Sequence, residues 1–89
     1  MANKNDVVTV ITYAGEFVGK FDSVSDNSVT LNDPRLVMPS ERGLAFGSGV
    51  CLTGETHGDS VTFNNYLFYV PTDAEVEKAY RSATSGLVL

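Results

Sequence analysis

The polar residues whose types and spacing could do chemistry lie in the stretch AGEFVGKFDSVSDNSVTL, residues 14–31. Asp26, Asn27 and Ser28 belong to the cluster SDNS, and Thr30 follows two residues later. Carboxyl, amide and hydroxyl groups together supply the hydrogen-bond donors and acceptors that read the edge of a nucleobase. The same residue types also form ordinary hairpin turns, because Asp, Asn and Ser bond to their own backbone. The sequence leaves both interpretations open.

Catalytic and metal-binding chemistry finds little support in the remaining residues. His57 lies in the glycine-flanked turn GETHGDS, where no third group holds it as a general base. Together with the single cysteine, Cys51, it makes only two strong zinc ligands, so we interpret Cys51 as a small buried hydrophobic residue. The stretch GLAFGSG, residues 43–49, lacks the lysine of a phosphate-binding loop. We therefore expect no enzymatic activity, no metal and no cofactor.

Length and charge narrow the class of protein. A chain of 89 residues predicts a single domain, residues 1–89, with one small core that gains stability by self-association. The net charge of −5 and the scattering of six basic residues argue against non-specific binding to a phosphate backbone. No apolar run approaches the roughly 18 residues of a membrane span, and the start MANKNDVV lacks a secretory core. We expect a soluble, unexported protein without a membrane partner.

Alternating apolar residues predict five short strands between residues 6 and 70. β-Branched and aromatic residues with turn signals between them place these strands at 6–13, 16–24, 28–31 with a continuation to Met38, 50–53 and 60–70. Pro34 confines the third strand to an edge or a break. Pro39 to Gly49 reads as a long irregular loop. The last strand is apolar on both faces after Asn65, so it needs cover from a helix or a neighbouring subunit.

Gly19 is the informative residue within the second strand. A glycine inside a strand marks a bulge, a bend at a barrel corner or a close backbone approach. Five short strands joined by hairpin turns are typical of a small barrel, SH3-like or OB-like, and a second strand bent at Gly19 favours the SH3-like form. The predicted fold class is thus all-β, a small, strongly bent five-stranded barrel with a C-terminal helix.

The helix is predicted over residues 73–85. Thr72 and Glu75 form a capping box at its start. Val76, Ala79 or Tyr80, and Ala83 share one apolar face at three-to-four spacing. Gly86 is expected to end the helix, and the apolar tail at residues 87–89 is expected to pack.

The stretch that contains SDNS resembles the first half of the Sm/LSm signature. In that family a Gly, an apolar residue, a second Gly, Leu and an apolar residue occupy the bent second strand, and Asp-x-x-Met-Asn-Leu crosses the turn into the third. The matching positions here are Gly15, Phe17, Gly19, Phe21, Val24, Asp26, Val29, Thr30 and Leu31.

The chain departs from the family pattern in several places. Gly19 comes one residue early, and Thr30 stands where the family has its base-contacting Asn. The Arg-Gly pair expected before the last strand is replaced by LTGETHGDSV, and Arg42-Gly43 lies in an earlier loop. The family's N-terminal helix has no room before Asp6, whereas a helix is predicted at the other end.

The resemblance implies a homo-oligomeric ring in which strand four of one protomer pairs with strand five of the next. It also implies binding of single-stranded RNA or DNA near the turn, with Asp26, Asn27, Ser28 and Thr30 as the site residues. NDPR and YRSATSG are in addition similar to small proteins of tailed bacteriophages. The alternative is therefore a phage structural or assembly subunit with no role in nucleic-acid binding. Either function implies the cytoplasm of a bacterial or phage-infected cell.

Overall fold

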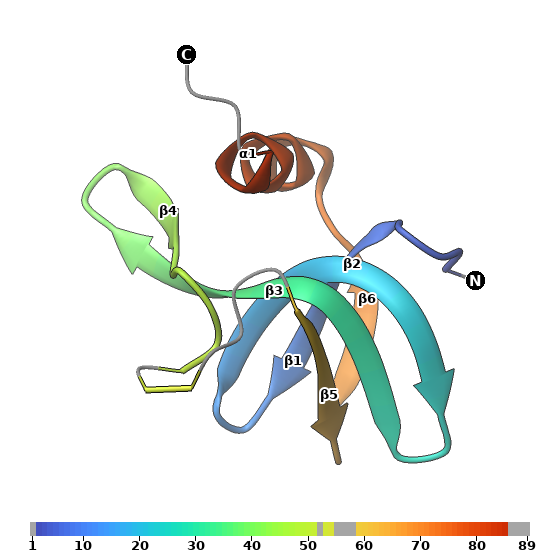
Figure 1. The fold of residues 1–89 in the computed structure, drawn as a ribbon. Helices are drawn as coiled ribbons and strands as arrows, with labels where there is room; N and C mark the ends of the chain where they lie inside the picture. The colour runs from blue at the N-terminus through green and yellow to red at the C-terminus, as the bar shows by residue number, and fades with distance from the viewer. Residues whose placement is uncertain (1, 52, 55–58, 86–89) are drawn as a thin grey trace.

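The computed structural model of this protein describes residues 2–51, 53–54 and 59–85. The structure is mostly antiparallel β-sheet with one C-terminal helix (Figure 1). Its elements, in chain order, are β1 (Val7–Thr12), β2 (Gly15–Ser25), β3 (Ser28–Ser40), β4 (Gly43–Phe46), β5 (Ser60–Asn64), β6 (Phe68–Pro71) and α1 (Ala74–Thr84).

The sheet order is β4-β3-β2-β1-β6, and β5 pairs with β3 outside this path. All of these pairings are antiparallel. The long β3 therefore pairs with β5 along its first half and with β4 along its second half. Among the described residues no pairing joins β5 to β6, so the sheet is not closed.

The bend of the long strands is centred on Gly19 and Pro34. Val18 pairs with Arg35 but Lys20 pairs with Asn32, so two residues of β3, Asp33 and Pro34, lie opposite the single residue Gly19. A Cβ atom at Gly19 would lie 3.0 Å from Pro34 Cα, which explains the glycine as a close approach of two backbones. Pro34 is buried in this bulge, so it neither ends β3 nor lies on an edge, because the bulge removes the need for its missing N–H.

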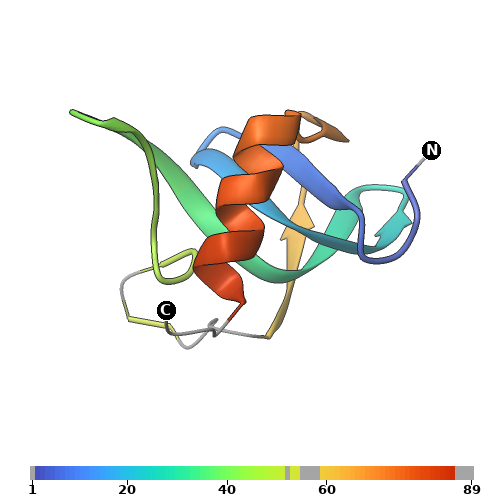
Figure 2. The same ribbon diagram turned by 90° about the horizontal axis from the view of Figure 1, so that it is seen from above.

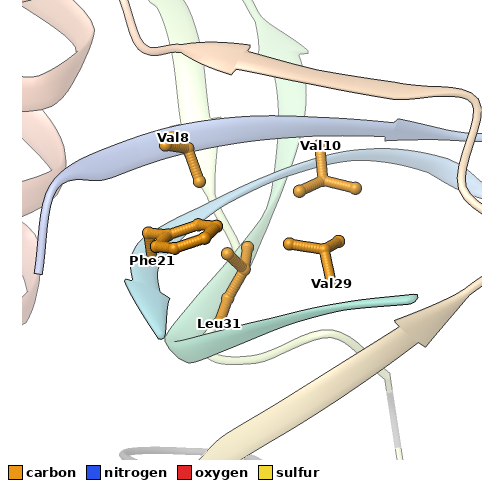
Figure 3. Packing of buried hydrophobic residues seen from close by; sticks show 5 residues of the cluster. All are labelled: Val8, Val10, Phe21, Val29 and Leu31. Atoms are coloured by element: carbon orange, nitrogen blue, oxygen red, sulfur yellow. The ribbon is translucent and has the colours of Figure 1, made fainter. Parts of the chain in front are cut away.

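The main core lies between the two halves of the bent sheet. Val8 and Val10 from β1, Phe21 from β2, and Val29 and Leu31 from β3 point toward one another (Figure 3). All five are almost completely removed from solvent. Alternation along each strand places these residues on one face, as the sequence pattern predicts.

The helix packs across the opposite face of the sheet (Figure 2). Tyr80 is fully buried against Val7 and Val18, with Val37, Phe46 and Val76 packed around them. This cover explains why Val18 is buried although it points away from the main core. The predicted helix is confirmed, but Ala83 of its proposed apolar face is exposed and lies outside the cluster that packs around Tyr80.

The start of the helix differs from the predicted capping box. The Asp73 carboxylate, not the Thr72 hydroxyl, accepts hydrogen bonds from the Glu75 and Val76 amides, at 3.1 and 3.3 Å. Thr72 instead shares a 2.9 Å hydrogen bond between its Oγ1 and that of Thr9. A carboxylate also interacts favourably with the positive end of the helix dipole.

A polar network anchors the helix to the bulge of β3. The Tyr80 hydroxyl donates to the Asp33 carbonyl at 2.6 Å, and the Arg35 guanidinium bonds to the Asp33 carboxylate at 3.0 Å. Asp33 has a φ of 50°, so the bulge turns its carbonyl toward the helix. Burial, with a smaller contribution from the Asp33 charge, raises the pKa of Tyr80 to about 12.

The prediction of a fourth strand at residues 50–53 is wrong. The strand lies at Gly43–Phe46, within the stretch interpreted as a loop, and pairs with Val37–Ser40. Val50, Cys51 and Thr53 form bends instead, and Leu52 lies outside the described residues. Cys51 is exposed rather than buried, because no strand carries it into the core.

The last predicted strand is divided in two. Residues 60–70 form β5 and β6 with a corner at Asn65, whose φ is 56°. The corner turns β5 toward β3 and β6 toward β1, which gives six strands instead of five. The expected burial of both faces after Asn65 is also wrong within the single chain, since Leu67, Phe68 and Val70 are exposed.

Within the described residues, α1 is too short and too polar to cross a lipid bilayer.

Candidate nucleic-acid interface

Three of the predicted site residues, Asp26, Asn27 and Ser28, lie at the turn between β2 and β3, at the end of the sheet opposite α1 (Figure 1). Asp26 and Asn27 form the turn and are exposed, and Ser28 is half-buried as the first residue of β3. Val24 and Val29 pair just inside the turn, with Val29 fully buried in the main core. The turn is therefore fixed by the core at its base, while its polar side chains extend into solvent.

Thr30 is set apart from the other three residues. It lies opposite Thr62 of β5, and the two Oγ1 atoms share a hydrogen bond of 2.9 Å. Ser60 makes a similar cross-strand hydrogen bond to the Asn32 side chain. These pairs tie β5 to β3, and the Thr30 hydroxyl already has a partner within the sheet.

The structure brings the β5–β6 corner beside the turn. The Asn65 backbone N–H donates to the Asn27 carbonyl at 2.7 Å, and Asn64 lies opposite Ser28 in the register of β5 and β3. Asn64 and Asn65 do not stand out as site residues in the sequence, because the alternating pattern continues through them. The signal was the asparagine pair itself, since Asn adopts a positive φ more readily than other non-glycine residues.

We call the exposed side chains of Asp26, Asn27, Asn64 and Asn65 the turn–corner surface. All four are exposed, and none forms a side-chain hydrogen bond with another described residue. Three amides and one carboxylate thus present donors and acceptors to solvent from two segments that a backbone hydrogen bond holds together. This set of groups suits the edge of a base better than a phosphate, because it carries no positive charge.

Positive charge is located elsewhere in the described structure. Arg35 is buried beside Asp33, Arg81 pairs with Glu77 at 2.9 Å, and Lys4 lies 3.6 Å from Asp22. Arg42 lies in the β3–β4 turn, far along the chain and the sheet from the β2–β3 turn.

A second surface lies beside the exposed strand β6. Phe68, Val70 and Leu44 are 51%, 42% and 54% exposed, and together with Ile11 and Val76 they line an open groove of about 260 Å³. In the described residues β6 pairs only with β1, and β4 pairs only with β3. Both strands therefore present an open edge beside exposed apolar side chains.

The described residues contain no group of three His, Cys, Asp or Glu side chains placed to hold a metal ion. His57 lies outside the described residues, as do Gly86 and the apolar tail.

Comparison of the chain with protein-family models and with curated proteins finds no match.

Proposed function

We propose that this protein is an Sm-like subunit that assembles edge to edge into a closed homo-oligomeric ring and binds single-stranded RNA or DNA at the turn–corner surface. The hydrogen bond between Asn65 N–H and the Asn27 carbonyl carries the proposal. It joins the turn predicted from the sequence to a second loop and places exposed amides from both loops on one surface.

The topology supports an SH3-like barrel of the Sm kind. β2 and β3 are long and sharply bent, β5 folds back onto β3, and β6 pairs with β1. The short link at residues 65–67 joins β5 directly to β6, and no pairing joins these two strands among the described residues. In a barrel of this kind, pairing of β5 with β6 would close the sheet.

Self-association follows from the open edges. Pairing of β6 of one copy with β4 of the next would satisfy unpaired backbone groups and cover Phe68, Val70 and Leu44. Such a contact is heterologous, so a suitable rotation closes it into a ring. The ring would bury the apolar residues that a single copy leaves exposed.

A ring also compensates for weak contacts at each subunit. The turn–corner surface lacks basic residues, so a single copy gains little from the phosphate backbone. Several copies around one axis add their contacts to the same strand, which raises the overall affinity by multivalency.

Fluorescence anisotropy with labelled oligo-A and oligo-U at two salt concentrations tests the binding. The double variant Asp26→Ala, Asn27→Ala is expected to weaken binding by about tenfold, since well-placed base contacts are worth about 1–3 kcal/mol each. Ser82→Ala, on the exposed face of α1, is the matched control and should bind like the wild type. No anisotropy change with either oligonucleotide at low salt would contradict the nucleic-acid function.

A structural or assembly subunit of a phage particle is the second candidate. The net charge of −5 and the absence of Lys and Arg from the turn–corner surface favour it. For this function the same edges would assemble, but neither oligonucleotide would bind at low salt.

A further inference from the structure

An open groove of about 490 Å³ lies between the β1–β2 turn and the end of β5. Phe17 and Phe63 form its apolar floor, with ring centroids 4.9 Å apart. Tyr13 lines it from the β1–β2 turn, and Asn64 and Asn65 line it from the end of β5 and the β5–β6 corner. The groove is therefore continuous with the turn–corner surface, which contains the same two asparagines.

Tyr13 projects from the turn without a structural reason for its ring. Its side chain is 90% exposed. The turn is held by Thr12 instead, whose Oγ1 accepts from the Ala14 and Gly15 amides at 3.0 and 3.2 Å and donates to the Gly15 carbonyl at 3.1 Å. These hydrogen bonds use no atom of the Tyr13 side chain, so its ring is available for a contact outside the chain.

The amides across the groove are held in place and unused. The Asn65 backbone is fixed by its hydrogen bond to Asn27, and Asn64 is the last residue of β5. Neither side-chain amide forms a hydrogen bond with another described residue, in contrast to the neighbouring Thr62, which is bonded to Thr30. The groove thus contains the hydrogen-bond donors and acceptors of two asparagine amides beside the exposed ring of Tyr13.

The groove's chemistry selects a flat, uncharged ligand. None of its described lining residues is charged, which disfavours a phosphate. A free tyrosine ring with amides nearby matches the way single-stranded bases are bound, by stacking on an aromatic side chain and hydrogen bonding along an edge. No carboxylate among the described lining residues is available to accept from the paired hydroxyls of a sugar.

We propose that this groove binds one nucleobase, with adenine preferred, by stacking on Tyr13 and by hydrogen bonds to Asn64 and Asn65. Adenine presents the adjacent donor and acceptor that an asparagine amide matches. The inference rests on the proposed function, because the next nucleotide of the same strand would reach Asp26 and Asn27. Tyr13 would supply the stacking contact that the β2–β3 turn lacks.

The test uses NMR of the full-length protein with adenosine at millimolar concentration, which has no phosphate and so probes base binding without contacts to a nucleic-acid backbone. Adenosine is expected to shift the Tyr13 ring signals and the Asn64 and Asn65 side-chain amide signals. Tyr13→Phe should keep these amide shifts and Tyr13→Ala should lose them. In parallel, Tyr13→Ala should weaken oligo-A binding by about tenfold, since stacking one base is worth about 1–3 kcal/mol.

The outcomes separate the groove from the proposed function. Adenosine shifts without oligo-A binding would support the groove and contradict the strand-binding function. Oligo-A binding that is equal in the wild type and Tyr13→Ala, with no adenosine shifts, would overturn the groove and leave the function standing. Shifts with maltoheptaose but none with adenosine would also overturn the proposal, in favour of a saccharide site. Ser82→Ala is the control, and the backbone amide spectrum of each variant verifies that it folds.

Discussion

Gly19 shows how a single residue position sets the shape of the sheet. A methyl group there would lie 3.0 Å from Pro34 Cα and 3.1 Å from Leu31 Cβ, and a backbone atom cannot move aside easily. Gly19→Ala is therefore expected to destabilise the protein by about 1–3 kcal/mol. Urea unfolding followed by circular dichroism measures the change.

Gly47→Ala is the matched control for that substitution. The nearest atom to a Cβ at Gly47 is the Gly49 carbonyl oxygen at 3.4 Å, and the other neighbours are at 3.7 Å. This variant should lose clearly less stability than Gly19→Ala. Equal losses would show that the effect comes from glycine in general and not from the close approach to Pro34.

Tyr80 links the stability of the fold to alkaline pH. Its pKa is raised from 10.0 to about 12 in the folded protein, chiefly by burial. Because the folded state holds this proton more tightly than the unfolded state, its contribution to stability is complete below pH 10 and is lost between pH 10 and 12. The free energy of unfolding should fall by about 2 kcal/mol over this interval through Tyr80 alone.

Tyr80→Phe isolates this contribution. At neutral pH the variant loses the hydrogen bond to the Asp33 carbonyl and should be less stable by about 1–2 kcal/mol. Between pH 10 and 12 its stability should decline less steeply than that of the wild type, as measured by urea unfolding at several pH values. Parallel pH profiles for the two proteins would contradict the role given to Tyr80.

Most individual residues of the core could be predicted, whereas the polar contacts could not. Phe21, Val29 and Leu31 follow from alternation, which depends only on neighbours along the chain, whereas β1 carries valines on both faces. The cap at Asp73 could not be predicted, because Thr72 is also a good capping residue and its engagement with Thr9, distant in sequence, decides between them.

At the scale of elements, the open edge of β6 carries the proposed assembly. Val70 is 42% exposed on this strand, so a lysine there keeps the fold and places a charge in the proposed contact. Val70→Lys is expected to weaken self-association by at least about tenfold, because a charge buried without a partner costs more than 1.4 kcal/mol. Sedimentation velocity over a range of protein concentrations measures the effect.

Val24→Lys is the control for the edge variant. Val24 is exposed to a similar extent but lies near the end of β2, beside the β2–β3 turn. It should assemble like the wild type. Dissociation of both variants to the same degree would place the contact somewhere other than β6.

Elements that depend on a continuous pattern of neighbouring residues could be predicted, and elements that depend on pairing with a distant strand could not. β1, β2 and α1 rest on continuous patterns within the chain, and the structure confirms them within one or two residues. β4 was missed because GLAF is flanked by turn residues, while VCLT has the more strand-like composition. GLAF forms the strand because it pairs with Met38 and Pro39. A pattern of neighbouring residues does not reveal this pairing.

The division of residues 60–70 illustrates the same limit at the site. Asn64 and Asn65 are both suited to a positive φ, which Asn65 adopts, but the apolar alternation around them outweighs this signal. Half of the turn–corner surface could therefore not be predicted, since Asn65 bonds to Asn27 and Asn64 lies opposite Ser28 only after the chain bends.

At the scale of the whole molecule, three chain segments converge at one end of the sheet. The β1–β2 turn, the β2–β3 turn and the β5–β6 corner lie opposite the helix, and together they carry the groove and the turn–corner surface (Figure 1). The apolar groove beside β6 is lined by Val76 of α1 and Leu44 of β4 together with Phe68 and Val70, so it lies on the side of the helix. Assembly through the edge would repeat the polar end around a common axis, so the two proposals support each other.

Sedimentation velocity of a mixture of the protein with dye-labelled oligo-A, observed at the dye's absorbance at low salt, tests both proposals at once. The dye is expected to move with a particle that contains several protomers. Dye that sediments at the rate of the free oligonucleotide would contradict nucleic-acid binding, and dye that moves with a single protomer would contradict the ring.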